Sequence, residues 1–452
     1  MQLHVAFDDT DSLKGQCTTY LGTLFLKHLL HEKIHLTDFP QLIRLNPNVP
    51  FKTRGNGAVV FRLEVADKKQ AEEVKKYVIN LIDKNAHKKD SNTNPGAVFI
   101  EGTIHPYLHG FYKKALTEVI EVAEAEKLAK QVKAEYRKWK NGRGIIGALA
   151  AIGSDLHDDY TYELLAYRQK KNFKKPRKYN FASLQQMDEV LQHLTFANLY
   201  EDRPRIFPTG PDPVFCGIRG EGYKAVIQGF EMLTGVEKCD FYSLWRTNQG
   251  TDCHYAERKV KDLKPHYSGK IYGVVASNPE YFGNNPGNRH VQFDLHDDTG
   301  TIRCVAYEPT KEFRQEVAGL VKGDKVLVFG GVRPEGEFEG AKYPQSISLE
   351  KLQPLELIEA CKLENPSCSK CGGKTSSLGK DKGFKCKKCG LESREWKKTV
   401  TFLPRTLEEG KSYIVPVCAI RHLTKPASRE GRRQSPFLRP KDLDELMFKK
   451  LE

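Results

Sequence analysis

The chain has 452 residues, which is enough for roughly three to four domains. Its formal net charge of +14 favours a polyanionic partner, above all a nucleic acid. An apolar run of about eighteen residues, as a membrane-spanning helix needs, does not occur, and charge by Asp8 excludes a signal-peptide pattern. Four of the eleven cysteines have metal-ligand spacing and seven are scattered, which predicts a reducing, cytoplasmic setting.

An acidic cluster lies near the N-terminus. Residues 3–7 alternate in the way of a strand, and Asp8, Asp9 and Asp11 follow at its carboxyl end, where α/β folds place chemistry. Carboxylate oxygens suit Mg²⁺ and the phosphates that accompany it. Thr18 stands at the start of an apolar, helix-like run. The pattern indicates phosphoryl transfer, or else a plain turn followed by a helix cap, which favours the same residue types.

Residues 1–150 are expected to form a first domain of α/β type. Apolar spacing predicts strands over 58–65 and 97–101 and helices over 68–86 and 116–132. A glycine-rich apolar stretch that includes Gly142 and Gly144 then marks the boundary to a second domain.

A second candidate site in this domain is a basic, glycine-containing loop. It comprises Lys52, Arg54, Gly55 and Asn56. Cations beside bare backbone amides make a phosphate cradle, although the spacing of a Walker loop is absent. The alternative is a basic hairpin turn. Beside the acidic cluster, the loop favours triphosphate binding.

Residues 151–263 are predicted to form a small α+β sandwich. A strand over 160–167 precedes a basic stretch at 168–178 and a helix over 183–193. Asp212 and Glu221 lie in loops fixed by glycine and proline, where they either pair with a cationic substrate or serve only as turn residues.

Residues 264–355 turn to β structure and are predicted to form an OB barrel. Strands are expected over 269–276, 291–296, 302–307 and 325–332, with a helical insert over 311–320. Such barrels often bind single-stranded nucleic acid, and the alternative is a barrel that acts only as a scaffold.

Residues 356–420 contain the strongest local signal in the chain. Two C-x-x-C knuckles, Cys368 with Cys371 and Cys386 with Cys389, predict one closed, structural zinc site in a zinc ribbon. Residues 421–452 form a basic C-terminal tail, which is typical either of a flexible arm on RNA or of a solvated tail.

Taken together, these motifs resemble the archaeal tRNA 2-agmatinylcytidine (agmatidine) synthetase family. The segments that carry the resemblance are 8–12, 17–19, 44–57, 142–149, 210–221 and 246–252. The match runs in order along nearly the whole chain and includes the OB and zinc-ribbon modules. It implies a kinase-like α/β domain, a ferredoxin-like α+β domain, an OB barrel and a zinc ribbon.

The resemblance also implies an activity: ligation of agmatine to C2 of the wobble cytidine in the CAU anticodon of an isoleucine tRNA. ATP phosphorylates the C2 oxygen, agmatine displaces the phosphate, and ATP ends as AMP and phosphate. The resemblance implies that Asp8, Asp9 and Asp11 hold Mg²⁺ on ATP and that Thr18 is autophosphorylated. It assigns Lys52, Arg54, Gly55, Asn56, Gly142 and Gly144 to ATP binding.

Agmatine binding by Asp212 and Glu221 is our own inference, from charge complementarity with a guanidinium group. The expected cofactors are ATP, Mg²⁺ and Zn²⁺, and the protein is expected to act as a monomer. Two alternatives stay open: a non-catalytic RNA-binding protein, and a tRNA-modifying ATPase that uses another amine such as lysine.

Overall fold

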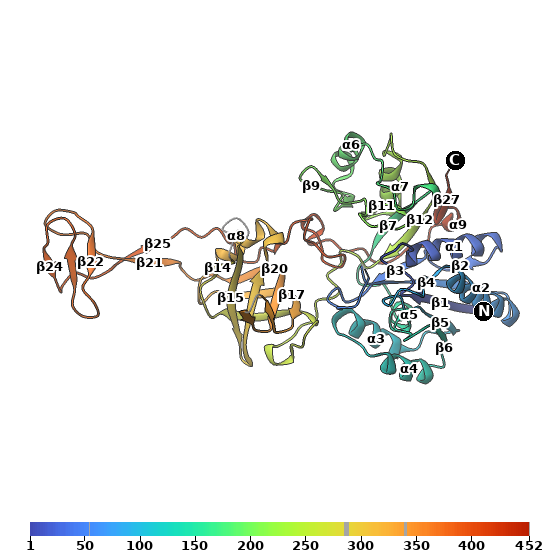
Figure 1. Ribbon diagram of the computed structural model, residues 1–452, viewed down its shortest axis with the longest axis horizontal. Helices are drawn as coiled ribbons and strands as arrows, with labels where there is room; N and C mark the ends of the chain where they lie inside the picture. The colour runs from blue at the N-terminus through green and yellow to red at the C-terminus, as the bar shows by residue number, and fades with distance from the viewer. Residues whose placement is uncertain (54, 284–288, 339–340, 452) are drawn as a thin grey trace.

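The computed structural model describes residues 1–53, 55–283, 289–338 and 341–451. It consists of a head and an arm (Figure 1). The head contains the N-terminal half of the chain and the last residues, the OB barrel adjoins it, and the zinc ribbon lies at the far end of the arm. Within the described residues, no helix is long and apolar enough to cross a membrane.

One mixed sheet runs through the whole head. Its strands follow in the spatial order β6 (Glu135–Lys138), β5 (Gly96–Glu101), β1 (Gln2–Asp8), β4 (Gly57–Glu64), β3 (Gln41–Arg44), β12 (Cys239–Thr247), β7 (Thr161–Arg168), β11 (Val214–Gly220) and β8 (Thr195–Phe196). The two predicted head domains share this sheet, because β3 pairs in parallel with β12 through Arg246 and Gln41.

The prediction of a strand before the acidic cluster is confirmed, but its reasoning was wrong in one respect. β1 lies between β4 and β5 and is antiparallel to both, so the parallel-sheet argument does not apply. His4 and Ala6 are buried like Leu3, Val5 and Phe7, so both faces of β1 are covered.

The helices of the first half are α1 (Thr18–His31), α2 (Lys68–Asn85), α3 (Pro106–Thr117), α4 (Val122–Gln131) and α5 (Gly144–Ile152). The single helix predicted over 116–132 is wrong: α3 ends at Thr117 and α4 begins at Val122. The predicted boundary at residue 150 falls inside α5, which packs on β1, β4 and β5.

The second half of the head has the ferredoxin-like order of elements. β7, α6 (Phe181–Leu191), β8, β11, α7 (Tyr223–Glu231) and β12 occur in this order, with the short hairpin of β9 (Leu199–Tyr200) and β10 (Arg203–Pro204) inserted between β8 and β11, and the strands of the sheet lie in the order β12-β7-β11-β8. This is the split βαβ arrangement. The strand and helix predicted here are confirmed.

The arm begins with a closed barrel. β13 (Ser268–Val275), β15 (His290–Asp297), β16 (Gly300–Ala306), β20 (Ser346–Glu356) and β17 (Lys325–Arg333) pair in this order, and β17 returns to β13. Helix α8 (Phe313–Ala318) lies between β16 and β17 in the chain. The order and the parallel β16–β20 pair are those of an OB fold.

A two-stranded stalk carries the zinc ribbon. β21 (Cys361–Glu364) pairs with β25 (Thr399–Phe402), and the ribbon between them contains β22 (Thr375–Ser377), β23 (Phe384–Cys386) and β24 (Glu392–Ser393). The chain therefore leaves the barrel for the ribbon and comes back, as Figure 1 shows.

The C-terminal residues are not a flexible arm, which corrects that prediction. Tyr413–Ile414 (β26) pairs with β20 of the barrel, and Phe448–Lys450 (β27) pairs with β12 of the head. Between them Arg429 is 1% exposed. The basic side chains of this segment suggested a flexible arm or a solvated tail in the sequence. In the structure some of them form buried ion pairs.

Candidate functional site

A cavity of about 490 Å³ opens in the head, next to the start of the arm. Its lining comes from the acidic cluster with residues 17–19, from the 42–57 segment, from residues 115–120 and 143–147, from the ferredoxin-like half, and from residues 417–426. Of the predicted site residues, the lining includes Asp8, Asp9, Asp11, Thr18, Lys52, Gly55, Asn56 and Asp212. Arg54 lies outside the described residues.

The acidic cluster sits at the end of β1, and the carboxyl groups of Asp8 and Asp9 have raised pKa values there. Burial, followed by the charge of Asp9, raises the pKa of Asp8 to about 8. Burial also raises the pKa of Asp9 to about 7, although Arg143 opposes it through a 3.0 Å ion pair. Like charges crowded into a buried place disfavour ionisation unless a cation joins them. Carboxylate oxygens are the ligands that Mg²⁺ prefers, although among the described residues these three side chains do not meet within 4.8 Å of one another.

Thr18 lies directly beside this cluster. It is the first residue of α1, is 5% exposed, and accepts a 3.0 Å hydrogen bond from the hydroxyl of Thr10. A threonine at a helix N-terminus has its hydroxyl near unpaired backbone amides, which favour an added phosphate. The geometry thus places the predicted acceptor hydroxyl and the predicted metal ligands in one cavity.

Helix α5 approaches the acidic cluster more closely than any side chain would permit. A Cβ atom on Gly147 would lie 1.9 Å from Oδ2 of Asp8, and one on Gly144 would lie 2.5 Å from the carbonyl oxygen of Asp8. Glycine is required at both positions for this contact. Within the described lining, Arg143 and Gly147 face the cavity and Gly142 and Gly144 do not, so ATP binding by the latter two stays a prediction.

The basic loop forms another wall of the cavity. Burial, followed by the charge of Arg421, lowers the pKa of Lys52. A Cβ atom on Gly55 would lie 2.8 Å from Nη1 of Arg44 and 2.9 Å from the ring of His422, so a larger residue there would displace these side chains. Several cations therefore surround a bare stretch of backbone, as a polyphosphate site requires.

A buried polar row crosses the sheet below the cavity. Arg44 on β3, Glu163 on β7 and Arg219 on β11 form two ion pairs, with Glu163 3.7 Å from Arg44 and 3.1 Å from Arg219. Gln249, which follows β12, donates a 2.5 Å hydrogen bond to Glu163. Because these strands are close together in the sheet, the row joins the two halves of the head.

Sequence reasoning assigned no role to this row. Arg44 and Gln249 stood in segments that carried the family resemblance, but their partners come from distant parts of the chain. His422, whose Nδ1 lies 3.0 Å from Oε1 of Gln249, was counted only as one of the tail's basic residues. The signal in the sequence was a polar glutamate inside the apolar strand 161–168.

The two carboxylates predicted to bind agmatine already have protein partners. Asp212 accepts a 3.0 Å hydrogen bond from Arg177. Glu221 accepts from Arg429 at 2.6 and 3.1 Å and lies outside the cavity lining that the structure describes. Agmatine binding by either stays a prediction, and for Glu221 it requires the release of a buried arginine.

The four predicted zinc ligands come together as expected. Their sulfur atoms lie within 4.8 Å of one another, with Cys368 and Cys389 at 3.6 Å and Cys371 and Cys386 at 3.6 Å. Tetrahedral zinc with bonds of about 2.3 Å needs sulfur–sulfur distances of about 3.8 Å. The Cys389 amide lowers the pKa of Cys386 to about 6, whereas at Cys371 the Gly373 amide opposes the neighbouring thiols, which raise the pKa of that group.

A second acidic group in the head does not form a metal site. Glu72, Glu101 and Glu135 surround Nζ of Lys75 at 2.8, 2.7 and 2.6 Å. The lysine takes the place that a cation would occupy.

Comparison with known proteins assigns the modules. Family models match over the described arrangement: the TiaS TCKD domain over residues 4–141, the TiaS FLD domain over 142–254, an OB-fold nucleic acid binding domain over 270–355, and the TiaS C-terminal zinc ribbon domain over 365–407.

Full-length relatives agree with these models. The chain is 43% identical to the isoleucine-tRNA 2-agmatinylcytidine synthetase TiaS of Pyrococcus horikoshii, over 94% of this chain and 97% of the relative. It is 42% identical to that of Thermococcus sibiricus, over 94% and 96%. The chain belongs to the tRNA 2-agmatinylcytidine synthetase family.

Solved structures of the family show the same architecture. The complex of TiaS with its isoleucine tRNA and ATP matches with a TM-score of 0.82 at 36% identity, over 96% of this chain and 99% of that one. The complex of TiaS with that tRNA, AMPCPP and agmatine matches with 0.80 at 35% identity, over 96% and 99%. The predicted combination of α+β head, OB barrel and zinc ribbon is confirmed.

Proposed function

We propose that this chain ligates agmatine to C2 of the wobble cytidine of an isoleucine tRNA in an ATP-dependent reaction, as a single chain in the cytoplasm. Family membership supports the reaction, because relatives of this chain were solved with an isoleucine tRNA, with ATP and with agmatine. The observation that carries the proposal is the cavity, which gathers strand-end carboxylates, a threonine hydroxyl and a basic loop.

The acidic cluster performs the phosphoryl-transfer part of the reaction. Asp8, Asp9 and Asp11 would hold Mg²⁺, which would neutralise charge on the triphosphate. Lys52, Arg54, Gly55 and Asn56 contact the phosphates, Gly142 and Gly144 also contribute to ATP binding, and Thr18 accepts a phosphoryl group from ATP. The C2 oxygen of cytidine is a poor leaving group, so its phosphorylation precedes attack by the amine.

The arm supplies the RNA-binding part. Cys368, Cys371, Cys386 and Cys389 hold one Zn²⁺, which keeps the exposed, lysine-rich ribbon folded. A wobble base must leave its stack to reach a cavity, and basic surfaces that hold the surrounding backbone stabilise that state. Residues 1–150, 151–263, 264–355, 356–420 and 421–452 remain our division of the chain.

Mass analysis of the tRNA nucleosides tests the proposal. The protein is incubated with an unmodified isoleucine tRNA transcript bearing a CAU anticodon, ATP and agmatine, and the digest is compared with a reaction without agmatine. We expect a cytidine that has gained agmatine with loss of water. A lysine adduct formed from a mixture of the two amines, or unchanged cytidine with bound tRNA, would contradict the proposal.

A further inference from the structure

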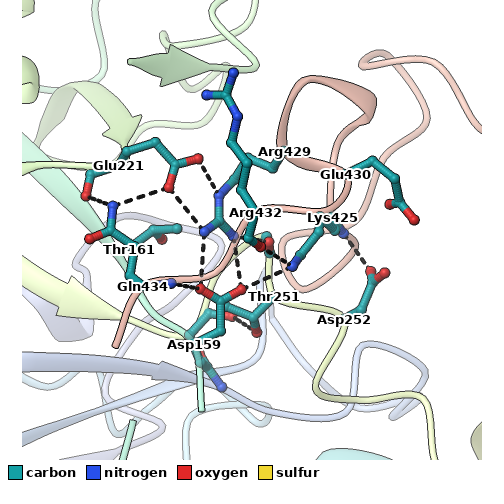
Figure 2. A network of polar contacts seen from close by, with 12 residues as sticks. Asp159, Thr161, Glu221, Thr251, Asp252, Lys425, Arg429, Glu430, Arg432 and Gln434 are labelled. Carbon is teal, nitrogen blue, oxygen red and sulfur yellow. Dashed lines mark hydrogen bonds and ion pairs between the residues drawn. The ribbon is translucent and has the colours of Figure 1, made fainter. Parts of the chain in front are cut away.

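The C-terminal segment 421–434, which we call the clasp, is anchored to the head by a buried ion-pair network (Figure 2). The guanidinium of Arg429 lies between Glu221, at 2.6 Å, and Asp159, at 3.1 Å. Lys425 also pairs with Asp159 at 3.0 Å, and the backbone amide of Gln434 donates to the same carboxylate at 2.9 Å. Most of these groups are deeply buried, so the clasp has a defined position.

The loop after β12 fixes the part of the clasp nearest the cavity. The amide of Gly250 donates to the carbonyl of His422 at 2.8 Å, and the amide of Asp252 donates to the carbonyl of Leu423 at 2.9 Å. Arg429 returns a bond to the carbonyl of Gly250. The loop and the clasp therefore hold each other, and His422 lies in the cavity wall as a result.

Hydrogen bonding decides which ring nitrogen of His422 carries a proton. The amide nitrogen of Gln249 must face the carboxylate of Glu163, so its oxygen Oε1 faces His422. An amide oxygen only accepts, which makes Nδ1 of His422 the donor. In the neutral ring Nε2 then has no proton. A Cβ atom on Gly55 would lie 2.9 Å from this Nε2, so the Nε2 edge of the ring lies against the phosphate loop, and His422 is one of the residues that line the cavity.

On the basis of the proposed function, we propose that His422 is a catalytic residue whose Nε2 accepts the proton released by the agmatine amine as it attacks C2. The C2–N bond forms, an N–H bond breaks and its proton passes to Nε2. The bond from C2 to the phosphorylated oxygen breaks, and phosphate leaves with that electron pair.

Other acceptors in the cavity have competing partners. Asp8, Asp9 and Asp11 are assigned to the metal, and Glu163 bonds with two arginines and Gln249. The charge of Arg44, then burial, lowers the pKa of His422 well below its usual value, which keeps the ring neutral. A bound triphosphate offsets the arginine charge and makes the ring more basic when it is needed.

The test separates the two half-reactions in the full chain. Enzyme, tRNA and labelled ATP are mixed first, label at Thr18 is measured, and agmatine is then added in a single turnover. Glutamine at position 422 keeps a polar atom near Nε2 but does not take up a proton. We expect His422→Gln to retain label and to transfer agmatine about 10²–10⁴-fold more slowly. His31→Gln, at an exposed histidine far along α1, is the control.

The outcomes are distinguishable. If wild-type protein makes no agmatine nucleoside, the proposed function fails; if wild type and His422→Gln transfer agmatine equally fast, only the role of His422 fails. If His422→Gln does not fold, Gln249→Met is used instead. This variant keeps the imidazole of His422 but removes the hydrogen bond that decides which ring nitrogen carries the proton. We expect label at Thr18 and amine transfer about tenfold slower in that variant. An unchanged transfer rate would overturn the proposal.

Discussion

Two groups of carboxylates in the head differ in how their charge is balanced. Asp159 and Glu221 share the guanidinium of Arg429, and that pairing raises the pKa of the arginine although burial opposes it. Asp8 and Asp9 have Arg143 beside them, yet their pKa values stay raised to about 8 and about 7. A balanced cluster holds segments together, whereas an unbalanced one is suited to binding a cation.

Breaking the balanced cluster should have the largest effect. Arg429→Ala leaves Asp159 and Glu221 buried without their guanidinium, so we expect a loss of about 3–5 kcal/mol in the free energy of unfolding of the head. Urea unfolding followed through the buried Trp245 measures it. Arg432→Ala, which removes a surface bond to the carbonyl of His193, should change the same quantity by less than about 0.5 kcal/mol. Equal losses of stability in Arg429→Ala and Arg432→Ala would contradict the view that Arg429 anchors the clasp.

The acidic cluster of Asp8, Asp9 and Asp11 should matter for the rate of the reaction rather than for folding. Asp11→Asn preserves shape and removes charge, so we expect cytidine modification to slow by about 10²–10³-fold. Labelled ATP should mark Thr18 in the wild type and leave no label there in Thr18→Ala. Both variants should bind tRNA normally, because the barrel and the ribbon are distant in the chain. A normal rate of cytidine modification in Asp11→Asn would show that the cluster is only a turn and not a metal site.

The zinc ribbon contains neither of the two carboxylate groups, so a variant in the ribbon serves as a control for the variants in the head. Cys386→Ser removes one of four ligands, and we expect loss of one zinc per chain, measured by elemental analysis. tRNA affinity should fall about tenfold, which corresponds to about 1.4 kcal/mol. ATP-dependent label at Thr18 should persist. Loss of that label together with zinc would mean that head and arm do not fold independently.

The basic stretch 168–178 also contains a buried and an exposed part, and its exposed lysines should show the smallest effects. Arg168 is buried against Glu237 at 2.5 Å, so alanine there should lower stability. Lys174 and Lys175 are exposed, and alanine at each should reduce the dependence of tRNA affinity on salt by about one unit of slope. If tRNA affinity depends on salt with the same slope when Lys174 and Lys175 are both replaced by alanine, this surface is not part of the RNA interface.

Much of the fold was predictable from the sequence because its signals are local. The C-x-x-C knuckles, the alternation of the barrel strands and the apolar face of α2 each depend on a few neighbouring residues. The break between α3 and α4 was missed because apolar spacing continues across residues 118–121, while the chain turns there.

The site was only partly predictable, because half of it is made by distant pairings. Asp8 and Thr18 stand close in the sequence and were found together. The row of Arg44, Glu163 and Gln249 depends on β3 lying beside β12, which no local pattern reveals. His422 is separated from Gln249 by the whole arm, so the basic composition of its surroundings concealed it.

The claim that the acidic cluster is a cation site has a direct test in its pH dependence. Asp8 and Asp9 bind protons in the folded chain up to about pH 8 and about pH 7, whereas the unfolded chain releases them near pH 4. The folded state therefore holds more protons in this window, and its stability falls as pH rises.

Thermal unfolding with and without Mg²⁺ at about pH 5 and about pH 8 measures this linkage. We expect wild-type protein without metal to lose stability at the higher pH and Mg²⁺ to restore it there, with little effect at the lower pH. In Asp8→Asn, both the loss of stability at the higher pH and its restoration by Mg²⁺ should be smaller. An equal Mg²⁺ effect at the two pH values, or in the wild type and Asp8→Asn, would contradict the account.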